Sequence, residues 1–273
     1  MAGFFKRQAA YVLIAVNTLK EELTYTKNAW MSVASGFVGI MLQVMIWTAL
    51  YAGNGNQAVM GRSLKDMLTY TIIASLVGAV TSGGRLSHTA QEKMKSGEIA
   101  LDYLRPVSPR GMLIAATWGD KIVFLIIQAI PITLAALLVG GIGAPVSIGQ
   151  LLLFMLSLLL GYMINLALEL LMATFAFWFV STSTIGWFLS FFNLAMSGAI
   201  VPLWLLPDWL KAISQALPFQ AAAYIPVTIY MGGMGAAEFF SAIGVQLLWI
   251  AGLWGLQEIM WRRGIRRIVV HGG

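Results

Sequence analysis

Long apolar stretches alternate with short polar ones along the whole chain, and their lengths predict the fold. A membrane-spanning helix needs about 20 apolar residues at a rise of about 1.5 Å per residue. Six stretches meet this requirement or approach it, so we predict an all-α integral membrane protein with six transmembrane helices in a single domain, 1–273. The predicted spans are 29–52, 67–84, 112–139, 148–180, 185–205 and 238–260.

Two polar breaks separate the predicted spans in the middle of the chain. No charged residue occurs between Ile122 and Leu168, which is far too long for one crossing. The stretch GGIGAPVSIG interrupts it, and its glycines together with Pro145 are typical of a turn. The stretch STST, which starts at Ser181, is a second polar turn and precedes the predicted span 185–205.

Apolar residues before the first span recur on one helical face. Their spacings alternate between four and three residues, at Phe5, Ala9, Val12, Val16, Leu19 and Leu23. The apolar core from Ala9 to Val16 is too short to span a membrane. Charged residues follow it without a small-residue cleavage site, which disfavours a signal peptide. We predict an N-terminal amphipathic helix over 4–27 that lies in the inner membrane interface.

Composition supports a membrane protein. The chain is 59% hydrophobic and 10% charged, whereas soluble domains are about a quarter charged. Cysteine is absent, so disulfides and Cys-ligated metals are excluded. The net charge of +6 could indicate nucleic-acid binding, but no basic patch is interleaved with aromatics on a soluble domain. The distribution of the basic residues along the chain explains this charge better.

Basic residues collect in three regions that six spans would place on one side of the membrane. These regions hold 14 of the 17 Lys and Arg: Lys6, Arg7, Lys20, Lys27, Arg85, Lys93, Lys95, Arg105, Arg110, Lys121, Arg262, Arg263, Arg266 and Arg267. The other side has only Arg62, Lys65 and Lys211. Because cytoplasmic segments are enriched in Lys and Arg, we predict that both termini are cytoplasmic in a multi-pass protein of the cell (plasma or inner) membrane.

Motifs for enzymatic chemistry are missing from the sequence. It has no GxxxxGK[ST] phosphate loop and no HExxH, and its two histidines, His88 and His271, fall in predicted cytoplasmic segments. GNGNQA, which begins at Gly53, fits a loose dinucleotide pattern but follows a membrane helix rather than a strand. We therefore expect no catalytic residue, cofactor site or metal site in this chain.

Glu169 is the one carboxylate well inside a predicted span, about 15 Å from its inner end at helical rise. An intramembrane acid is costly and is usually functional or paired. It could be a proton or cation site, or a neutral, hydrogen-bonded acid that holds helices together. Asp120 and Lys121 are predicted to be interfacial, so Glu169 has no obvious partner inside the membrane, and the second interpretation is favoured.

The predicted cytoplasmic loop 85–110 contains SHTAQEKMKSGEIALDYLRPVSPRG. Residues 87–96 have helix-forming composition, and Gly97 is a plausible helix stop. Apolar side chains then follow where water is expected, at Ile99, Leu101, Tyr103 and Leu104, before Pro106 and Pro109 end the element. A short helix followed by exposed apolar residues is typical of a docking surface for a partner.

The segment VPLWLLPDWLKAISQALPF, 201–219, is apolar enough for a membrane but carries repeated breaks. It contains Pro202, Pro207, Pro218, Asp208 and Lys211, and another proline follows at position 226. Prolines interrupt helices, so the segment should form short helices instead of a span. Asp208 is a candidate N-cap for a half-helix over 208–216. Non-helical backbone at membrane depth must be buried in protein or line a wet cavity.

Two of these stretches resemble a known family. SGEIALDYLRPVSP is similar to the segment after the second span in permeases of type-2 ABC exporters, in the branch that includes daunorubicin-resistance-like permeases. The 201–219 segment is similar to the same family in its Pro-Leu turn, its Pro-Asp-Trp step and its LPF. The resemblance covers essentially the whole chain.

The resemblance implies a permease that forms half of a transmembrane dimer, with itself or with a sister permease. Two copies of a separate ABC-type ATPase, which would bind ATP and Mg, dock on the cytoplasmic face. The loop after span two supplies a coupling helix over about 87–96. The residues predicted to dock are His88, Gln91, Glu92, Lys93, Met94, Leu101, Asp102, Tyr103, Leu104 and Arg105.

The family also places a re-entrant helical hairpin outside, between spans five and six, which corresponds to 206–231. It would form an outer lid over the translocation path, and the alternative is a simple external loop. The lid residues are Pro202, Pro207, Asp208, Trp209, Pro218 and Phe219.

The predicted function is export of an amphipathic or hydrophobic solute: a drug, lipid, glycan or peptide. We expect its path between the dimer halves to be lined by Trp47, Tyr51, Phe191, Phe192, Asn193 and Met196, because aromatic and Met side chains suit apolar substrates. Packing against lipid or core is the alternative for each of them. The alternative function is an ion-coupled secondary transporter or channel that uses Glu169, but the sequence lacks the internal repeats typical of those folds.

Overall fold

A computed structural model of the chain describes residues 2–24, 26–53, 55, 58, 61–81, 85–138, 143, 147–179, 183–232 and 234–268. These residues form helices joined by turns and short connections, so the prediction of an all-α protein is confirmed. Parts of the GNGNQA, GGIGAPVSIG and STST stretches, including Pro145 and Ser181, lie outside the described residues.

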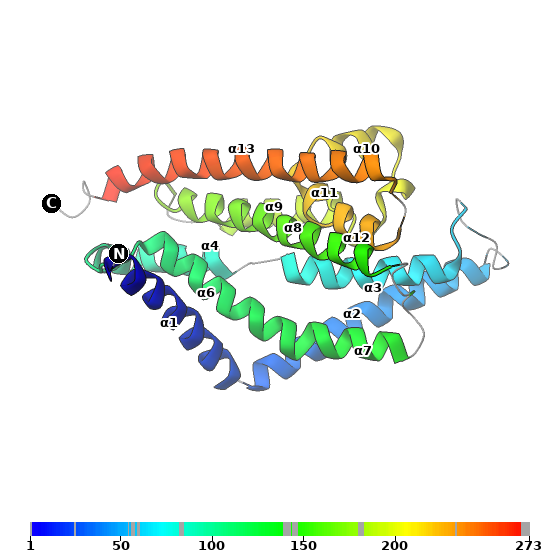
Figure 1. Ribbon diagram of the computed structural model, residues 1–273, viewed down its shortest axis with the longest axis horizontal. Coiled ribbons are helices and arrows are strands. Elements are labelled where there is room, and N and C mark those ends of the chain that lie inside the picture. The colour runs from blue at the N-terminus through cyan, green and yellow to red at the C-terminus, as the bar shows by residue number, and fades with distance from the viewer. Residues whose placement is uncertain are drawn as a thin grey trace.

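Five helical stretches are long and apolar enough to cross a membrane, and they match five of the six predicted spans. They are α2 (Thr26–Gly53), the stretch from α3 (Leu64–Thr81) through α4 (Arg85–Lys95), the stretch from α6 (Pro109–Phe124) into α7 (Ile130–Leu138), α8 (Ile148–Phe175) and α13 (Ala236–Ile268). Figure 1 shows α3 and α4 end to end, with α4 continuing the direction of α3.

The predicted span 185–205 is not a continuous helix. Helix α9 (Ser183–Met196) has 14 residues and is about 21 Å long, which is shorter than the hydrocarbon core of a bilayer. It ends at Ser197 and Gly198, and Gly198 has a φ of 78°, in the left-handed region. The hydroxyl of Tyr70 donates a hydrogen bond of 2.7 Å to the carbonyl of Gly198 and fixes this break.

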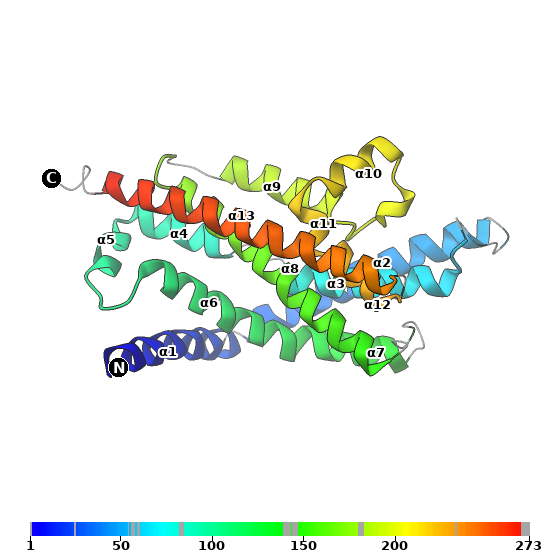
Figure 2. The same ribbon diagram turned by 45° about the horizontal axis from the view of Figure 1, so that its top comes forward.

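Short helices follow the break, as the prolines predict. They are the 3₁₀-helix η2 (Leu203–Leu205), α10 (Asp208–Gln215), α11 (Pro218–Ala222) and α12 (Tyr224–Tyr230). None is long enough to cross a bilayer. Helices α11 and α12 are buried against α8, whereas α10 lies outside them (Figure 2).

Helix α6 begins with a well-defined cap. The hydroxyl of Ser108 accepts a hydrogen bond of 3.1 Å from the backbone N–H of Gly111, and Pro109 occupies the first helical position, where a missing N–H costs nothing. The helix widens into one π-helical segment, η1 (Leu125–Ala129), before α7. Pro131, at the start of α7, cannot donate the usual backbone hydrogen bond, which accounts for the local change.

Helix α1 (Ala2–Thr24) lies along α6, which agrees with the predicted helix 4–27. The approach is close at Gly119, where an added Cβ would lie 2.4 Å from the backbone carbonyl oxygen of Ala15. The hydroxyl of Tyr11 accepts a hydrogen bond of 3.0 Å from the backbone N–H of Ser108. Helix α1 therefore holds the start of α6; its place in a membrane interface stays a prediction.

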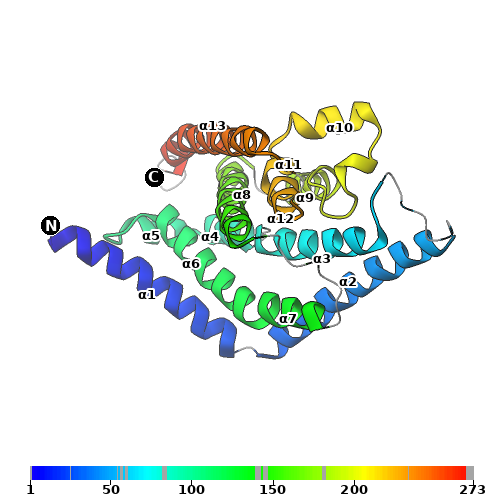
Figure 3. The same cartoon turned by 45° about the vertical axis from the view of Figure 1, so that its right-hand side comes forward.

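Helix α8 is the centre of the bundle. It packs against α13, α11, α12, α3 and α4, and Figure 3 shows it between α13 and the layer formed by α3 and α6. One hydrophobic cluster, around Tyr70 and Ile164, joins α8 to the short helices, and a second, around Leu170 and Trp261, joins α8 to α4 and α13. The core consequently extends along most of α8.

Three segments gather at one end of the molecule: the start of α1, the end of α13 and the tip formed by α4 and α5 (Glu98–Tyr103) (Figures 1 and 2). The short helices α10 to α12 lie toward the opposite end. This is the arrangement that the basic residues of the sequence predict, since all three segments are basic. Which end faces the cytoplasm stays a prediction.

Candidate functional site

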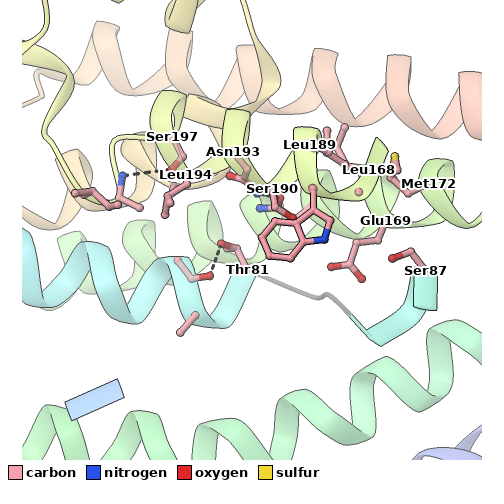
Figure 4. A pocket seen from close by; sticks show the side chains of 18 of the residues that line it. Thr81, Ser87, Leu168, Glu169, Met172, Leu189, Ser190, Asn193, Leu194 and Ser197 are labelled. Atoms are coloured by element: carbon pink, nitrogen blue, oxygen red, sulfur yellow. Dashed lines mark hydrogen bonds between the residues drawn. The ribbon is translucent and has the colours of Figure 1, made fainter. Parts of the chain in front are cut away.

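A cavity of about 670 Å³ opens between α3, the start of α4, α8 and α9. The polar residues on its wall include Ser75, Asn165, Glu169, Ser190, Asn193 and Ser197, and Figure 4 shows several of them facing a common space. Trp187, Leu168, Met172, Leu189 and Leu194 add apolar surface. The cavity is therefore mixed in character and suits a ligand with a polar and an apolar part.

Helical periodicity produces the polar wall. Asn165 and Glu169 are one turn apart on α8, and Ser190 and Asn193 are one turn apart on α9. The two helices meet where the amide nitrogen of Asn193 donates a hydrogen bond of 3.1 Å to the amide oxygen of Asn165. This bond holds α9 against α8 beside the cavity.

Glu169 has a cationic neighbour that sequence reasoning missed. The side chain of Lys121, on α6, interacts electrostatically with Glu169, and so does Asp120. The ammonium of Lys121 also donates a hydrogen bond of 3.2 Å to the carbonyl of Ala79, at the end of α3. Both residues lie about 16 Å beyond the start of α6 at helical rise. The premise that Glu169 has no basic neighbour is therefore wrong, whereas the interfacial position of Asp120 and Lys121 stays a prediction.

The hydrogen bonding of the Glu169 carboxylate is incomplete among the described residues. Its Oε2 is buried and has no hydrogen-bond partner among the described residues. In Figure 4 the carboxylate extends from α8 toward the start of α4, where Ser87 lies. A buried acceptor without a donor is destabilising, and such groups are often explained by an absent ligand, ion or water.

Of the six residues predicted to line the substrate path, Asn193 lines this cavity. Tyr51 is buried, and its hydroxyl donates a hydrogen bond of 3.0 Å to the carbonyl of Arg62. Phe191 and Phe192 are exposed and contact each other edge to face, with ring centroids 6.0 Å apart. Met196 packs on the core, and Trp47 is half-buried on α2. Their role in a path between two copies stays a prediction.

The α4–α5 segment is a folded hairpin rather than a free loop. Asp102 is buried, and one of its carboxylate oxygens lies 2.6 Å from the ammonium of Lys93. Gly97 joins the two helices with a φ of 78°, as expected of a helix stop. At the tip, Leu101 is 61% exposed and Leu104 is 83% exposed. The hairpin thus presents apolar side chains on a rigid support.

The structure separates the ten residues predicted to dock into groups. Leu101, Leu104, Arg105 and Glu92 are exposed. Lys93 and Asp102 are engaged with each other, and Met94 and Tyr103 are half-buried. Gln91 is buried and serves the interior, whereas the side chain of His88 borders the cavity, is 69% exposed and lies 3.5 Å from the carboxylate of Glu92. These differences in exposure along α4 arise because one face of the helix packs against α6 and α8.

An ionic cluster joins the start of α6 to the end of α13. The guanidinium of Arg110 contacts the carboxylate of Glu258 and donates a hydrogen bond of 3.2 Å to the amide oxygen of Gln257. The same carboxylate lies 2.6 Å from the guanidinium of Arg262. Arg110 was predicted only as one of the basic loop residues, and its partner could not be found from spacing.

The short outer helices are fixed to the bundle by glutamines. The amide nitrogen of Gln246, on α13, donates hydrogen bonds of 3.0 and 2.8 Å to the carbonyls of Ser157 and Ala221. The amide nitrogen of Gln150, on α8, donates hydrogen bonds of 2.8 Å to the carbonyls of Ile229 and Tyr230. Ala221, Ile229 and Tyr230 lie at the C-terminal ends of α11 and α12, where helix carbonyls have no partner within the helix, and these bonds satisfy them.

Among the predicted lid residues, Pro202, Pro218 and Phe219 are buried, whereas Pro207, Asp208 and Trp209 are exposed on α10 or beside it. The expected N-cap at Asp208 is wrong, because Pro207 occupies the cap position and no side chain caps the helix. Asp208 is the first helical residue instead, where its charge favours the helix dipole.

No cluster of three or more metal-ligating side chains occurs in the part of the chain that the structure describes. The site consists of an open cavity and a partly apolar tip, joined by the helices between them. Together with the long apolar helices, these features define a multi-pass membrane protein.

Comparison with protein families assigns this chain to a known family. The family described as ABC-2 family transporter protein matches residues 37–272, which is most of the chain, and the chain therefore belongs to this family. It is the membrane component of a transporter, a permease domain that is not itself catalytic, as the sequence predicts. Permeases of this family pair with ATPase subunits. A comparison with curated proteins found no match.

Proposed function

We propose that the chain is the permease subunit of an ATP-driven exporter, and that it forms half of a transmembrane dimer. The family assignment supports the pairing with an ATPase. The resemblance of 96–109 and 201–219 to the daunorubicin-resistance-like branch supports export of an amphipathic or hydrophobic solute. The observation that carries the proposal is the α4–α5 hairpin with its two exposed leucines.

The hairpin tip is the docking surface for the ATPase. Leu101 projects from α5 and Leu104 directly follows it, and exposed apolar side chains of this kind are typical of protein interaction sites. The ion pair of Lys93 with Asp102 holds α5 on α4. We therefore centre the proposed contact on the end of α4 and on α5, since Gln91 is buried and the most exposed apolar side chains lie at the tip.

Movement of the α4–α5 hairpin is transmitted to the helix bundle through the elements that contact it. The chain passes from the tip directly into α6, whose first turn is tied to α1 by Tyr11 and to α13 by Arg110. Helix α4 packs on α8, which lines the cavity. Closure of two ATPases on ATP would accordingly shift α6 and α8 relative to α9, which the hydrogen bond between Asn193 and Asn165 holds beside the cavity.

The position of the cavity supports outward transport from an inward-facing state. Its wall includes Ser87 and His88, at the start of α4, so it lies toward the end that carries the docking tip. At the opposite end the space is limited by Ala199 and Ile200, just beyond α9. A solute would enter from the cytoplasmic side and leave when the outer end opens.

A capture experiment tests this function. The tagged chain is purified from its native membrane in mild detergent, and co-purifying proteins are identified and assayed for vanadate-sensitive ATP hydrolysis. We expect a separate subunit with a phosphate-loop sequence. Leu104→Asp should abolish its capture, whereas Ile148→Asp, at an 80% exposed apolar position that starts α8, should not. Absence of any ATPase after crosslinking would contradict the proposal, as would unchanged capture by Leu104→Asp.

A further inference from the structure

The outward face of α13 changes from apolar to basic within about one helical turn. Helix α13 runs along one side of the bundle, beside α8 (Figure 1), and its outward face is apolar at Leu248 and Ile259. Arg263 follows Ile259 by four residues and Arg266 follows Arg263 by three, so they continue the same face. All four side chains are exposed. The stripe therefore joins a surface suited to acyl chains to a surface suited to anions.

Arg263 and Arg266 lack partners among the described residues. Neither side chain makes an ion pair or a hydrogen bond there. Arg262 differs, because its guanidinium lies 2.6 Å from the carboxylate of Glu258. Two like charges three residues apart on a helix are neighbours and repel each other. An anion bound between the two guanidinium groups would remove this repulsion.

The two arginines suit the phosphate of a lipid headgroup. A guanidinium is planar, stays charged at physiological pH and binds phosphate through paired hydrogen bonds. The pair follows the apolar part of the stripe directly, and the headgroup region of a bilayer follows its hydrocarbon core in the same way. Basic residues at this depth attract anionic lipids. An anionic phospholipid thus matches both parts of the stripe.

The apolar part of the stripe leaves space for an acyl chain. Gly252 and Gly255 lie on it between Leu248 and Ile259, and an added Cβ at either glycine meets nothing within 4 Å. A lipid chain can therefore approach the helix backbone at these two positions.

A second copy of the chain fits this face less well than a lipid does. Two copies related by a two-fold axis along the membrane normal present the same patch to each other at the same depth. The paired arginines of one copy would then face those of the other, without an acid between them. Charge therefore favours an anionic lipid as the occupant.

We propose that the outward face of α13 binds an anionic phospholipid, with its phosphate held by Arg263 and Arg266 and one acyl chain lying over Gly255 and Gly252. The site lies at the end of the molecule that carries the α4–α5 hairpin (Figures 1 and 2). It goes beyond the proposed function and does not depend on an ATPase, because it requires only that the chain spans a membrane.

Native mass spectrometry with two matched lipids tests the site. The full chain, purified in mild detergent and delipidated, is titrated with dioleoyl phosphatidylglycerol or dioleoyl phosphatidylcholine. The lipids share their acyl chains and differ in net charge, so we expect tighter, saturable binding of phosphatidylglycerol. Arg263→Gln and Arg266→Gln should each weaken that binding by about 10-fold, through loss of a charged hydrogen bond. Arg262→Gln removes the same charge from the same turn, but Glu258 holds Arg262, so this variant should bind phosphatidylglycerol like the unmodified chain.

A second variant blocks the acyl position and keeps both arginines. Gly255→Phe places a ring where the chain would lie, and it should fold because an added Cβ there meets no other atom. We expect it to reduce phosphatidylglycerol binding, whereas Gly255→Ala should largely retain it. Glycerol 1-phosphate carries the phosphate without acyl chains, and at equal concentration it should not displace the lipid.

Several results would overturn the inference: equal binding of the two lipids, unchanged phosphatidylglycerol binding in both arginine variants, or an equal loss in Arg262→Gln, which would indicate diffuse attraction to a basic end. Displacement by glycerol 1-phosphate would assign the site to a free phosphate compound. A dimer that is lost in Gly255→Phe would assign this face to a second copy. Failure of the proposed function is separate, because it appears as missing ATPase capture.

Discussion

Single glycines decide how closely α8 can approach the short outer helices. An added Cβ at Gly161 would lie 2.3 Å from the carbonyl oxygen of Ala222, whereas one at Gly252 would meet nothing within 4 Å. Both glycines lie inside long helices, so replacement by Ala gains a similar helix propensity of about 1 kcal/mol. We expect Gly161→Ala to destabilise the protein by about 1–3 kcal/mol through overpacking, and Gly252→Ala to be neutral or stabilising. Thermal unfolding of the two variants in nanodiscs compares them directly, and equal midpoints would contradict the close contact.

Asp102 should matter far more than the other charges of the loop. It is buried beside Lys93, and removal of one partner from a buried ion pair costs about 3–5 kcal/mol. We expect Asp102→Asn to loosen the α4–α5 hairpin, which limited proteolysis would detect as faster cleavage between 96 and 108. Arg105 is mostly exposed and 3.7 Å from Asp102, so Arg105→Gln should change cleavage little. Equal cleavage of the two variants would contradict this role.

At the scale of single residues, the sequence identifies unusual residues more readily than it identifies the residues that they contact. Glu169 is conspicuous because an acid inside an apolar run is rare. Lys121 cannot be paired with it from sequence, because the pairing depends on how α6 is rotated relative to α8. Arg110 and Glu258 were likewise unpaired, since they are 148 residues apart in the sequence. Asn165 and Trp187 carried no signal, because an amide or indole in an apolar helix is usually a packing residue.

The elements themselves follow from the apolar pattern, and the exceptions have local causes. Helices α2, α3, α8 and α13 begin and end within a few residues of the predictions, except that α8 ends at Phe175 rather than at 180 and α13 continues to Ile268 rather than ending at 260. The predicted span 185–205 fails at Gly198, because an apolar run conceals a left-handed turn that the hydroxyl of Tyr70 stabilises from another helix. One face of helix α4 is buried, because Leu86 and Ala90 pack in the core, and its role as a coupling helix stays a prediction.

The outer helices should depend on the glutamine that fixes them. Gln246 is fully buried, and its amide nitrogen serves the carbonyls of Ser157 and Ala221, so Gln246→Leu would leave both without this donor. A buried group left unsatisfied costs about 1–3 kcal/mol. We expect faster amide hydrogen exchange in α11 and α12 than in α13. Gln215→Leu, at an exposed position on α10, is the matched control. Unchanged exchange in Gln246→Leu would show that packing alone holds these helices.

The whole molecule places its basic segments at one end, and this makes the predicted topology testable. The chain has no cysteine, so a single introduced cysteine reports its own side of the membrane without background labelling. Ser96→Cys lies at the tip between α4 and α5, and Asp208→Cys starts α10; both positions are exposed. Positive residues favour the cytoplasmic side, so a membrane-impermeant maleimide should label only Asp208→Cys in intact cells. Permeabilisation should then expose Ser96→Cys, which shows that this position can react. Labelling of Ser96→Cys in intact cells would reverse the orientation, and with it the side on which the ATPase and the solute must approach.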